Sequence, residues 1–327
     1  MDLFTHVILG AAVGGFVASK KLGNKAIWWG AACSIIPDFD LFFAPWFETT
    51  EKLFIHRGLS HSIFFFLFLA PLLAILLHKF NKKIEYSLAQ WTRFIFFILV
   101  SHSFIDVFSV YGTGIFEPFI SKRYAISSLS IVDIFYTIPL FVTVLIALKV
   151  KQNRHKSIIS WFGIFISLLY LSFTVLNKLY IQSEFEKKLV SKDIKFSRTE
   201  IFPVPGSNFL WNCVAQDRDG FWMCYESNFS THNFELELYM RNDYYTFDFD
   251  DDMRFQNLQR FSRGFYIVEK NEAGELLFRD LRFGRFGLSS KAPFVFSFKI
   301  IQSQGKIQTI ESIYPSFSRF FLHEKSR

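Results

Sequence analysis

Histidine and aspartate recur in four short motifs within the first 135 residues of the chain. Imidazole and carboxylate groups are the ligands that zinc and similar divalent ions prefer. Ionisable groups within apolar segments mark functional sites, because burying them costs free energy. The motifs therefore predict a centre that holds one or two divalent ions, with zinc favoured. The predicted ligands are His6, Asp38, Asp40, His56, His61, His102 and Asp106.

Each motif alone has a structural explanation that needs no metal. His102 and Asp106 are four residues apart and share a helix face, and such a pair is more often hydrogen bonded than metal-binding. Residues 37–40 alone are typical of a helix break with a capping carboxylate, and a lone His6 near a helix start is usually structural. Taken together, the motifs bring several histidines and aspartates to one place. Such groups are hard to satisfy in an apolar bundle without a cation, and this favours the metal centre.

Long apolar segments surround these motifs. A helix that spans a bilayer needs about 20 mostly apolar residues. Segments that approach this length cover approximately residues 3–19, 26–47, 61–77, 91–110, 131–150 and 158–176. Residues 37–40 interrupt the second segment, and Gly10 and Gly14 form a small-xxx-small pair that would allow a close helix contact, although such pairs also arise by chance. We expect a membrane α-helical bundle of about six helices.

The loops between these segments carry unequal positive charge. The loops after the first, third and fifth segments hold eleven Lys and Arg residues, whereas the two alternate loops hold four. The positive-inside rule places the richer loops in the cytoplasm, and the N-terminus and everything after the sixth segment outside. Every predicted ligand then lies on the outer side. The Lys and Arg residues behind the net charge of +7 cluster between the apolar segments, as in membrane proteins. We therefore expect no nucleic-acid partner.

Seven short motifs follow one another within residues 1–135: Asp2-x-x-Thr5-His6, Pro37-Asp38-x-Asp40, His56-Arg57-Gly58-x-x-His61-Ser62, His102-x-x-x-Asp106, Tyr111-Gly112-Thr113, Pro118-Phe119 and Arg123-Tyr124. Their order resembles that of a known family, the bacterial predicted membrane-bound metal-dependent hydrolases, which include a LexA-regulated inner-membrane protein. The resemblance implies a hydrolase in the bacterial inner membrane.

The same residues are more distantly similar to the zinc-dependent phospholipase C and P1 nuclease group. That group uses an early Thr-His, an Asp loop and a His-x-x-x-Asp helix around several zinc ions. The similarity implies as ligands His6, Asp38 or Asp40, His61, and His102 with Asp106. The chain has no second His-x-x-x-Glu/Asp helix after Asp106, so one or two ions are expected rather than three.

Two divalent ions about 3.5–4 Å apart would polarise a phosphoryl oxygen and lower the pKa of bound water. We predict that Asp40 takes the proton of this water, although little separates it from Asp38. Arg57 is predicted to neutralise a substrate phosphate, with binding of a lipid headgroup phosphate as an equal alternative, and Arg123 is a weaker candidate. The outer interface makes a lipid or lipid-linked phosphoester the expected substrate.

The second half of the chain changes character after Asn177. We predict a transmembrane domain over 1–180, a linker or amphipathic helix over 181–200, and a small antiparallel β-rich extracytoplasmic domain over 201–327. Cys213 and Cys224 are placed symmetrically about the turn at 217–220, so they are predicted to face each other and form a disulfide in an oxidising compartment. Two reduced cysteines in an apolar strand are the alternative.

Two other functions fit the same residues. An ion-coupled transporter would use intramembrane His and Asp as an ion path, but it needs polar groups in both halves of the membrane. A non-catalytic envelope protein would use a closed metal site only to hold its helices together. An open coordination position would favour the hydrolase.

Overall fold

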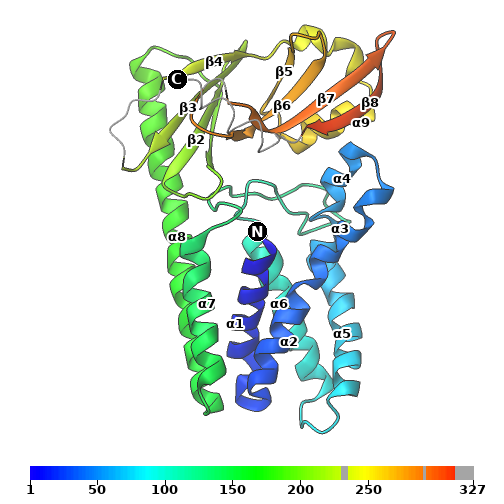
Figure 1. The fold of residues 1–327 in the computed structure, drawn as a ribbon, viewed down its shortest axis with the longest axis vertical. Coiled ribbons are helices and arrows are strands. Elements are labelled where there is room, and N and C mark those ends of the chain that lie inside the picture. The colour runs from blue at the N-terminus through cyan, green and yellow to red at the C-terminus, as the bar shows by residue number, and fades with distance from the viewer. Residues whose placement is uncertain (230–234, 290–291, 314–327) are drawn as a thin grey trace, which may run out of the picture. The chain divides into compact units, whose positions relative to one another are not determined.

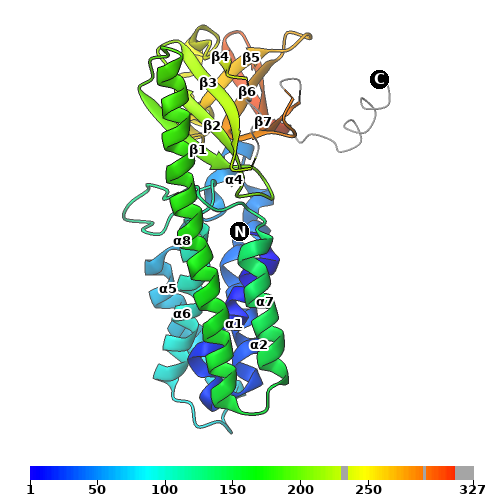
Figure 2. The ribbon, with the colours of Figure 1, turned by 90° about the vertical axis from the view of Figure 1, so that its left-hand side faces the viewer.

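The computed structural model describes residues 1–229, 235–289 and 292–313 (Figures 1 and 2). Its internal contacts divide the chain into two compact units. The first unit contains Met1–Trp46, Ile55–Asn177 and Pro205–Asn208. The second contains Phe47–Phe54, Lys178–Val204 and the rest of the chain from Phe209.

The first unit is helical. Its elements are α1 (Leu3–Leu22), α2 (Asn24–Ser34), η1 (Ile36–Phe39), α3 (Asp40–Phe43), η2 (Ala44–Trp46), η3 (Leu59–His61), α5 (Ile63–Phe80), α6 (Leu88–Asp106), α7 (Ile134–Lys149) and the first part of α8 (Asn153–Ser191). Five helical stretches are long and apolar enough to cross a membrane, and α7 is a shorter apolar helix of 16 residues. All six predicted segments are therefore helical, and the predicted break at residues 37–40 is the single-turn η1.

Helices α1 and α2 approach each other closely through glycines, as the Gly10/Gly14 spacing predicted. A Cβ atom on Gly14 would lie 2.3 Å from the carbonyl oxygen of Ala26, and one on Gly10 would lie 2.4 Å from the Cβ of Ser34. Neither position has room for a larger residue. This contact brings the end of α2 next to the first turns of α1, where His6 lies.

Residues 181–191 are helical, in agreement with the amphipathic helix that was the alternative to a linker over 181–200. Helix α8 continues to Ser191 because Ile181, Phe185 and Leu189 recur at helical spacing and are buried in a cluster with Trp211 and other residues of the second unit. The Lys and Glu residues between these apolar positions lie on the more exposed face of this amphipathic helix.

The second unit is built mainly from two four-stranded antiparallel sheets. The first has the order β1 (Arg198–Pro203), β2 (Leu210–Gln216), β3 (Gly220–Ser227) and β4 (Glu237–Met240). The second has the order β5 (Tyr266–Lys270), β6 (Leu276–Arg285), β7 (Phe294–Ser303) and β8 (Lys306–Ile313). Four short helices complete the described part: α4 (Thr49–Ile55), η4 (Asp243–Tyr245), η5 (Phe247–Phe249) and α9 (Met253–Phe261). The predicted antiparallel β-rich region is therefore present, as two sheets rather than one.

Cys213 and Cys224 are register partners across β2 and β3, as the symmetry of the turn predicted. Both side chains are buried thiols, and burial raises the pKa of Cys213 well above its ordinary value. The Sγ of Cys213 lies 3.9 Å from the carbonyl oxygen of Trp211, and the Sγ of Cys224 lies 3.6 Å from a carboxylate oxygen of Glu226. The disulfide itself stays a prediction.

Alkylation under denaturing conditions tests this disulfide. If the pair is oxidised in cells, only Cys33 should react without reductant, whereas all three cysteines should react after reduction. Intact-protein mass before and after alkylation counts the modified thiols. Three alkylated thiols in the unreduced sample would show that the pair stays reduced.

Candidate metal centre

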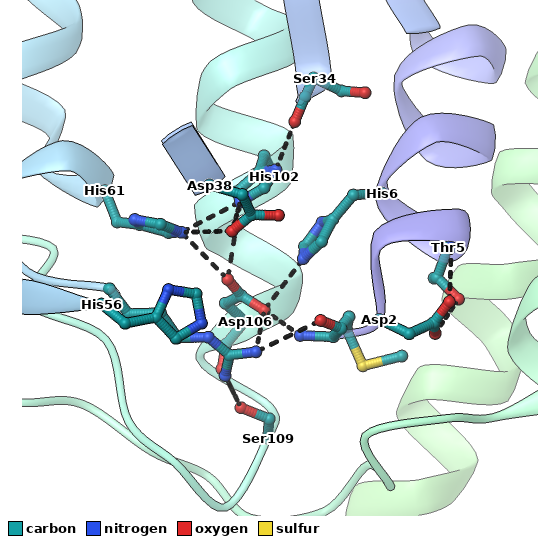
Figure 3. Close-up of polar contacts among 12 residues, drawn as sticks. Asp2, Thr5, His6, Ser34, Asp38, His56, His61, His102, Asp106 and Ser109 are labelled. Carbon is teal, nitrogen blue, oxygen red and sulfur yellow. Dashed lines mark hydrogen bonds and ion pairs between the residues drawn. The ribbon is translucent and has the colours of Figure 1, made fainter. Parts of the chain in front are cut away.

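Five of the predicted ligands meet in the first unit (Figure 3). His6 lies on α1, Asp38 on η1, His61 on η3, and His102 and Asp106 on α6. The side chains of all but Asp38 have no exposed surface, and that of Asp38 is 13% exposed. Chain segments as far apart as residues 6 and 106 thus deliver imidazoles and carboxylates to one place.

The distances among four ligand atoms have the size expected of metal ligands. The Nε2 atoms of His61 and His102 are 3.1 Å apart. Oδ1 of Asp38 lies 3.4 Å and 3.5 Å from these two nitrogens, and Oδ2 of Asp106 lies 3.5 Å and 3.7 Å from them. A tetrahedral zinc site with bonds of about 2.0–2.2 Å has ligand–ligand distances of about 3.3–3.6 Å. Each triangle therefore matches one face of a tetrahedral site.

Hydrogen bonds on the opposite side of each ring fix which nitrogen faces the centre. Nδ1 of His102 donates to the carbonyl oxygen of Ser34 over 2.7 Å. Nδ1 of His61 donates to Oγ of Ser60 over 2.9 Å, because the hydroxyl proton of Ser60 goes to Asp40. Both Nδ1 atoms are therefore protonated, and the neutral rings direct Nε2 lone pairs at each other. Two such lone pairs require a proton or a metal ion near them.

His6 has the surroundings of a further ligand. Its ring stacks on that of His102 with the centroids 3.7 Å apart, and its Nε2 lies 3.2 Å from Oδ1 of Asp106. Within the described residues neither ring nitrogen makes a hydrogen bond of good geometry, and Oδ2 of Asp106 likewise has none. Buried polar atoms without partners are costly, so the donor set fits a bound cation.

Asp40 lies beside the centre and organises the loop that carries His56 and His61. It accepts hydrogen bonds from Nδ1 of His56 (3.0 Å), the backbone N–H of Arg57 (3.1 Å) and Oγ of Ser60 (2.6 Å). Arg57 has a positive φ of 62°, a conformation that the bond to its N–H helps to hold. These bonds give Asp40 a positioning role in the loop, and its predicted role as base stays a prediction.

His56 is the most exposed histidine of the group, with 18% of its side chain accessible. Burial lowers the pKa of His56, and the nearby charge of Arg57 lowers it further, although the bond to Asp40 opposes this. With Asp38 and Asp40, His56 forms a second group whose ligand atoms lie within 4.8 Å of one another.

Arg57 and Arg123 lie at the centre in different ways. The Arg57 side chain is nearly fully buried, and its guanidinium lies 3.2 Å from Oδ1 of Asp106 and donates to Oγ of Ser109 over 2.5 Å. Arg123 is partly exposed and donates to the carbonyl oxygen of His56 over 2.9 Å. The charge of Arg57 therefore balances Asp106, and contact of either arginine with a phosphate stays a prediction.

Two other acidic residues near the motifs do not join the centre. Asp2 caps α1 by accepting from the backbone N–H and the hydroxyl of Thr5. Asp133 caps α7 and accepts from the hydroxyl of Tyr170. Partners of the centre that the motifs did not predict include the carbonyl of Ser34 and the hydroxyls of Ser60 and Ser109. No pattern of residue types marks a backbone carbonyl, but Ser60 lies inside the His56–His61 motif and could have been considered.

The helical unit and its buried His/Asp centre define a class of membrane protein with a candidate metal site. The family model described as YdjM inner membrane protein matches residues 1–181, which include every predicted ligand. The chain belongs to this family and is an inner membrane protein, consistent with the LexA-regulated membrane family that the motifs resemble.

Two curated relatives are similar to the chain. The uncharacterized protein YfhP of Bacillus subtilis (strain 168) is 26% identical over 220 residues, which cover 62% of this chain and 64% of the relative. The inner membrane protein YbcI of Escherichia coli (strain K12) is 26% identical over 113 residues, which cover 35% of this chain and 64% of the relative. The chain thus spans 64% of the length of each. No solved structure matches the chain.

Metal content tests the centre directly. Wild type loaded with zinc and then desalted should retain about one or two equivalents, whereas His102→Ala should lose at least one because a ligand with a fixed lone pair is gone. Elemental analysis by mass spectrometry measures this. His78→Ala is the matched control, since His78 is exposed at the end of α5. Equal zinc in wild type and His102→Ala would contradict the site.

A substitution of Asp40 tests whether this residue positions the ligands or binds the metal itself. Asp40→Asn keeps an acceptor but removes the charge that holds His56 and His61. Loss of such a partner should weaken zinc affinity about 10–100-fold and leave the number of bound ions unchanged. Competition with a fluorescent chelator measures the affinity. A lower ion count at saturating zinc would instead make Asp40 a ligand.

Proposed function

We propose that this protein is a membrane-embedded, metal-dependent hydrolase of lipid or lipid-linked phosphoesters. The observation that carries the proposal is the pair of His61 and His102 Nε2 atoms, 3.1 Å apart, with a carboxylate at ligand spacing on either side. If the two imidazoles and one of these carboxylates hold the ion, a tetrahedral site keeps one position open for water or substrate, the arrangement typical of catalytic rather than structural zinc.

The bound ion, the hydrogen bonds that orient the histidines, and Asp38 would each contribute differently to hydrolysis. A divalent ion at this place would supply a polarised phosphoryl oxygen and a more acidic water. The hydrogen bonds from His102 to Ser34 and from His61 to Ser60 would hold both rings in position. Asp38, whose side chain is the only partly exposed one of the five, lies where substrate could reach it.

The substrate class follows from the location of the centre. Its ligands lie at the ends of candidate membrane spans, on the elements η1, η3 and α6 and at the start of α1. The distribution of Lys and Arg between the loops supports an outer position for these ends and an extracytoplasmic location of the β-rich region. A phosphoester attached to a lipid is the compound most concentrated at such an interface.

The complete burial of His61, His102 and Asp106 favours a second candidate, a non-catalytic protein whose metal holds the helices together. An ion-coupled transporter has less support. An ion path would need further buried ionisable groups away from the centre. In the described part of the helical unit Lys156 is such a group, but its ammonium is already bound by Asn24 and by carbonyls at the end of α7.

Hydrolysis by purified protein in phospholipid vesicles separates these candidates. Release of phosphorylated headgroups should stop on chelation, return with zinc, and fall at least about 100-fold in Asp38→Ala, because the loss of a ligand removes the site. His155→Ala, at an exposed position of α8, is the control. Zinc retained without hydrolysis of a broad phosphoester panel would favour the structural role.

A further inference from the structure

The chain segment that carries Asp38 and Asp40 also exposes a cluster of large apolar side chains. In Phe39, Leu41, Phe42, Phe43 and Trp46 between half and almost three quarters of the residue surface is exposed. The rings of Phe42, Phe43 and Trp46 contact one another with centroids 5.7–5.9 Å apart. Exposed apolar residues therefore alternate with the carboxylates of the candidate centre along this segment.

A second loop near the centre has the same character. Phe119 is 75% exposed and Ile120 is 47% exposed. The ring of Phe119 contacts that of Phe64, in the first turn of the candidate span Ile63–Phe80, with centroids 4.8 Å apart. Lys122 and Arg123 follow after Ser121, and Arg123 donates to the backbone carbonyl of His56. Apolar and basic side chains thus occur together in this loop.

These features match the boundary between lipid headgroups and acyl chains. The aromatic cluster ends the candidate span Asn24–Trp46, and aromatic side chains, Trp above all, concentrate where membrane-spanning helices leave the hydrocarbon. Basic residues beside apolar ones bind the phosphates of lipid headgroups while the apolar side chains enter the acyl region. Residues 39–46 end one candidate span, and Phe119 contacts the first turn of another, so both apolar groups adjoin surface that the spans would present to lipid.

We propose that residues 39–46 and 119–122 enter the interfacial layer of the bilayer, and that a lipid phosphate reaches the His/Asp centre sideways from the membrane. The route for the lipid rests on the proposed function, whereas the membrane contact does not. Because Phe39 stands between Asp38 and Asp40, a lipid that packs against the aromatic cluster places its headgroup beside the carboxylates.

Quenching by brominated lipids tests the membrane contact. A bimane label on Phe42→Cys or Phe119→Cys, in the full chain in phosphatidylcholine–phosphatidylglycerol vesicles, should lose about half its fluorescence to lipids brominated near the headgroup. The same label on Phe247→Cys, an 82% exposed position of η5, should respond to iodide in water instead. The native cysteines are buried, so unsubstituted protein gives the background.

Kinetics test the lipid route. The ratio of the rate on vesicle phospholipid to the rate on water-soluble bis(p-nitrophenyl) phosphate should fall about tenfold in the double variant Phe42→Ser/Trp46→Ser, equivalent to about 1.4 kcal/mol of lost membrane contact. Phe247→Ser should keep the wild-type ratio. An unchanged ratio in the double variant would overturn the sideways route.

The outcomes are distinguishable. Labels at 42 and 119 that respond to iodide and not to brominated lipid overturn the membrane contact, and cross-linking between copies at residue 42 would assign the cluster to a dimer interface instead. A wild type that hydrolyses neither substrate overturns the proposed function and the lipid route with it, whereas the quenching result still decides the membrane contact.

Discussion

The constraint on which this structure depends is the burial of carboxylates and imidazoles in an apolar helical bundle. Asp106 has no exposed surface, and such a charge is tolerated only when it is paired and hydrogen bonded. Arg57, His6 and the amino group of Met1 all contact it. Helix packing, the break in the second span and the loop before α5 can each be understood as ways of bringing these partners together.

The backbone provides the precision that a metal centre needs. The glycine contact between α1 and α2 sets the end of α2, whose Ser34 carbonyl orients His102. The turn η1 after α2 brings Asp38 to the centre, and Asp40, two residues further, holds the loop of His56 and His61. Ligands supplied by rigid helices and fixed by second partners are the arrangement expected where geometry matters.

Sequence reasoning found the ligand types and the elements that carry them, because both depend on local pattern. The symmetry of the turn at 217–220 predicted the register of Cys213 with Cys224. Sequence reasoning could not find the pairing of Arg57 with Asp106, which depends on tertiary packing between residues 49 positions apart. The helical spacing of Ile181, Phe185 and Leu189 allowed an amphipathic helix to be predicted as an alternative to a linker, but their burial with Trp211 depends on tertiary packing.

Charge balance bears on how many ions the centre can hold. Asp38, Asp40 and Asp106 together carry three negative charges, and Arg57 and the amino group of Met1 each supply one positive charge beside Asp106. With neutral histidines, one divalent ion would leave a single positive charge, which one bound anion such as hydroxide could offset in a poorly solvated site. A second divalent ion would leave three positive charges. The charges therefore favour one resident ion over two.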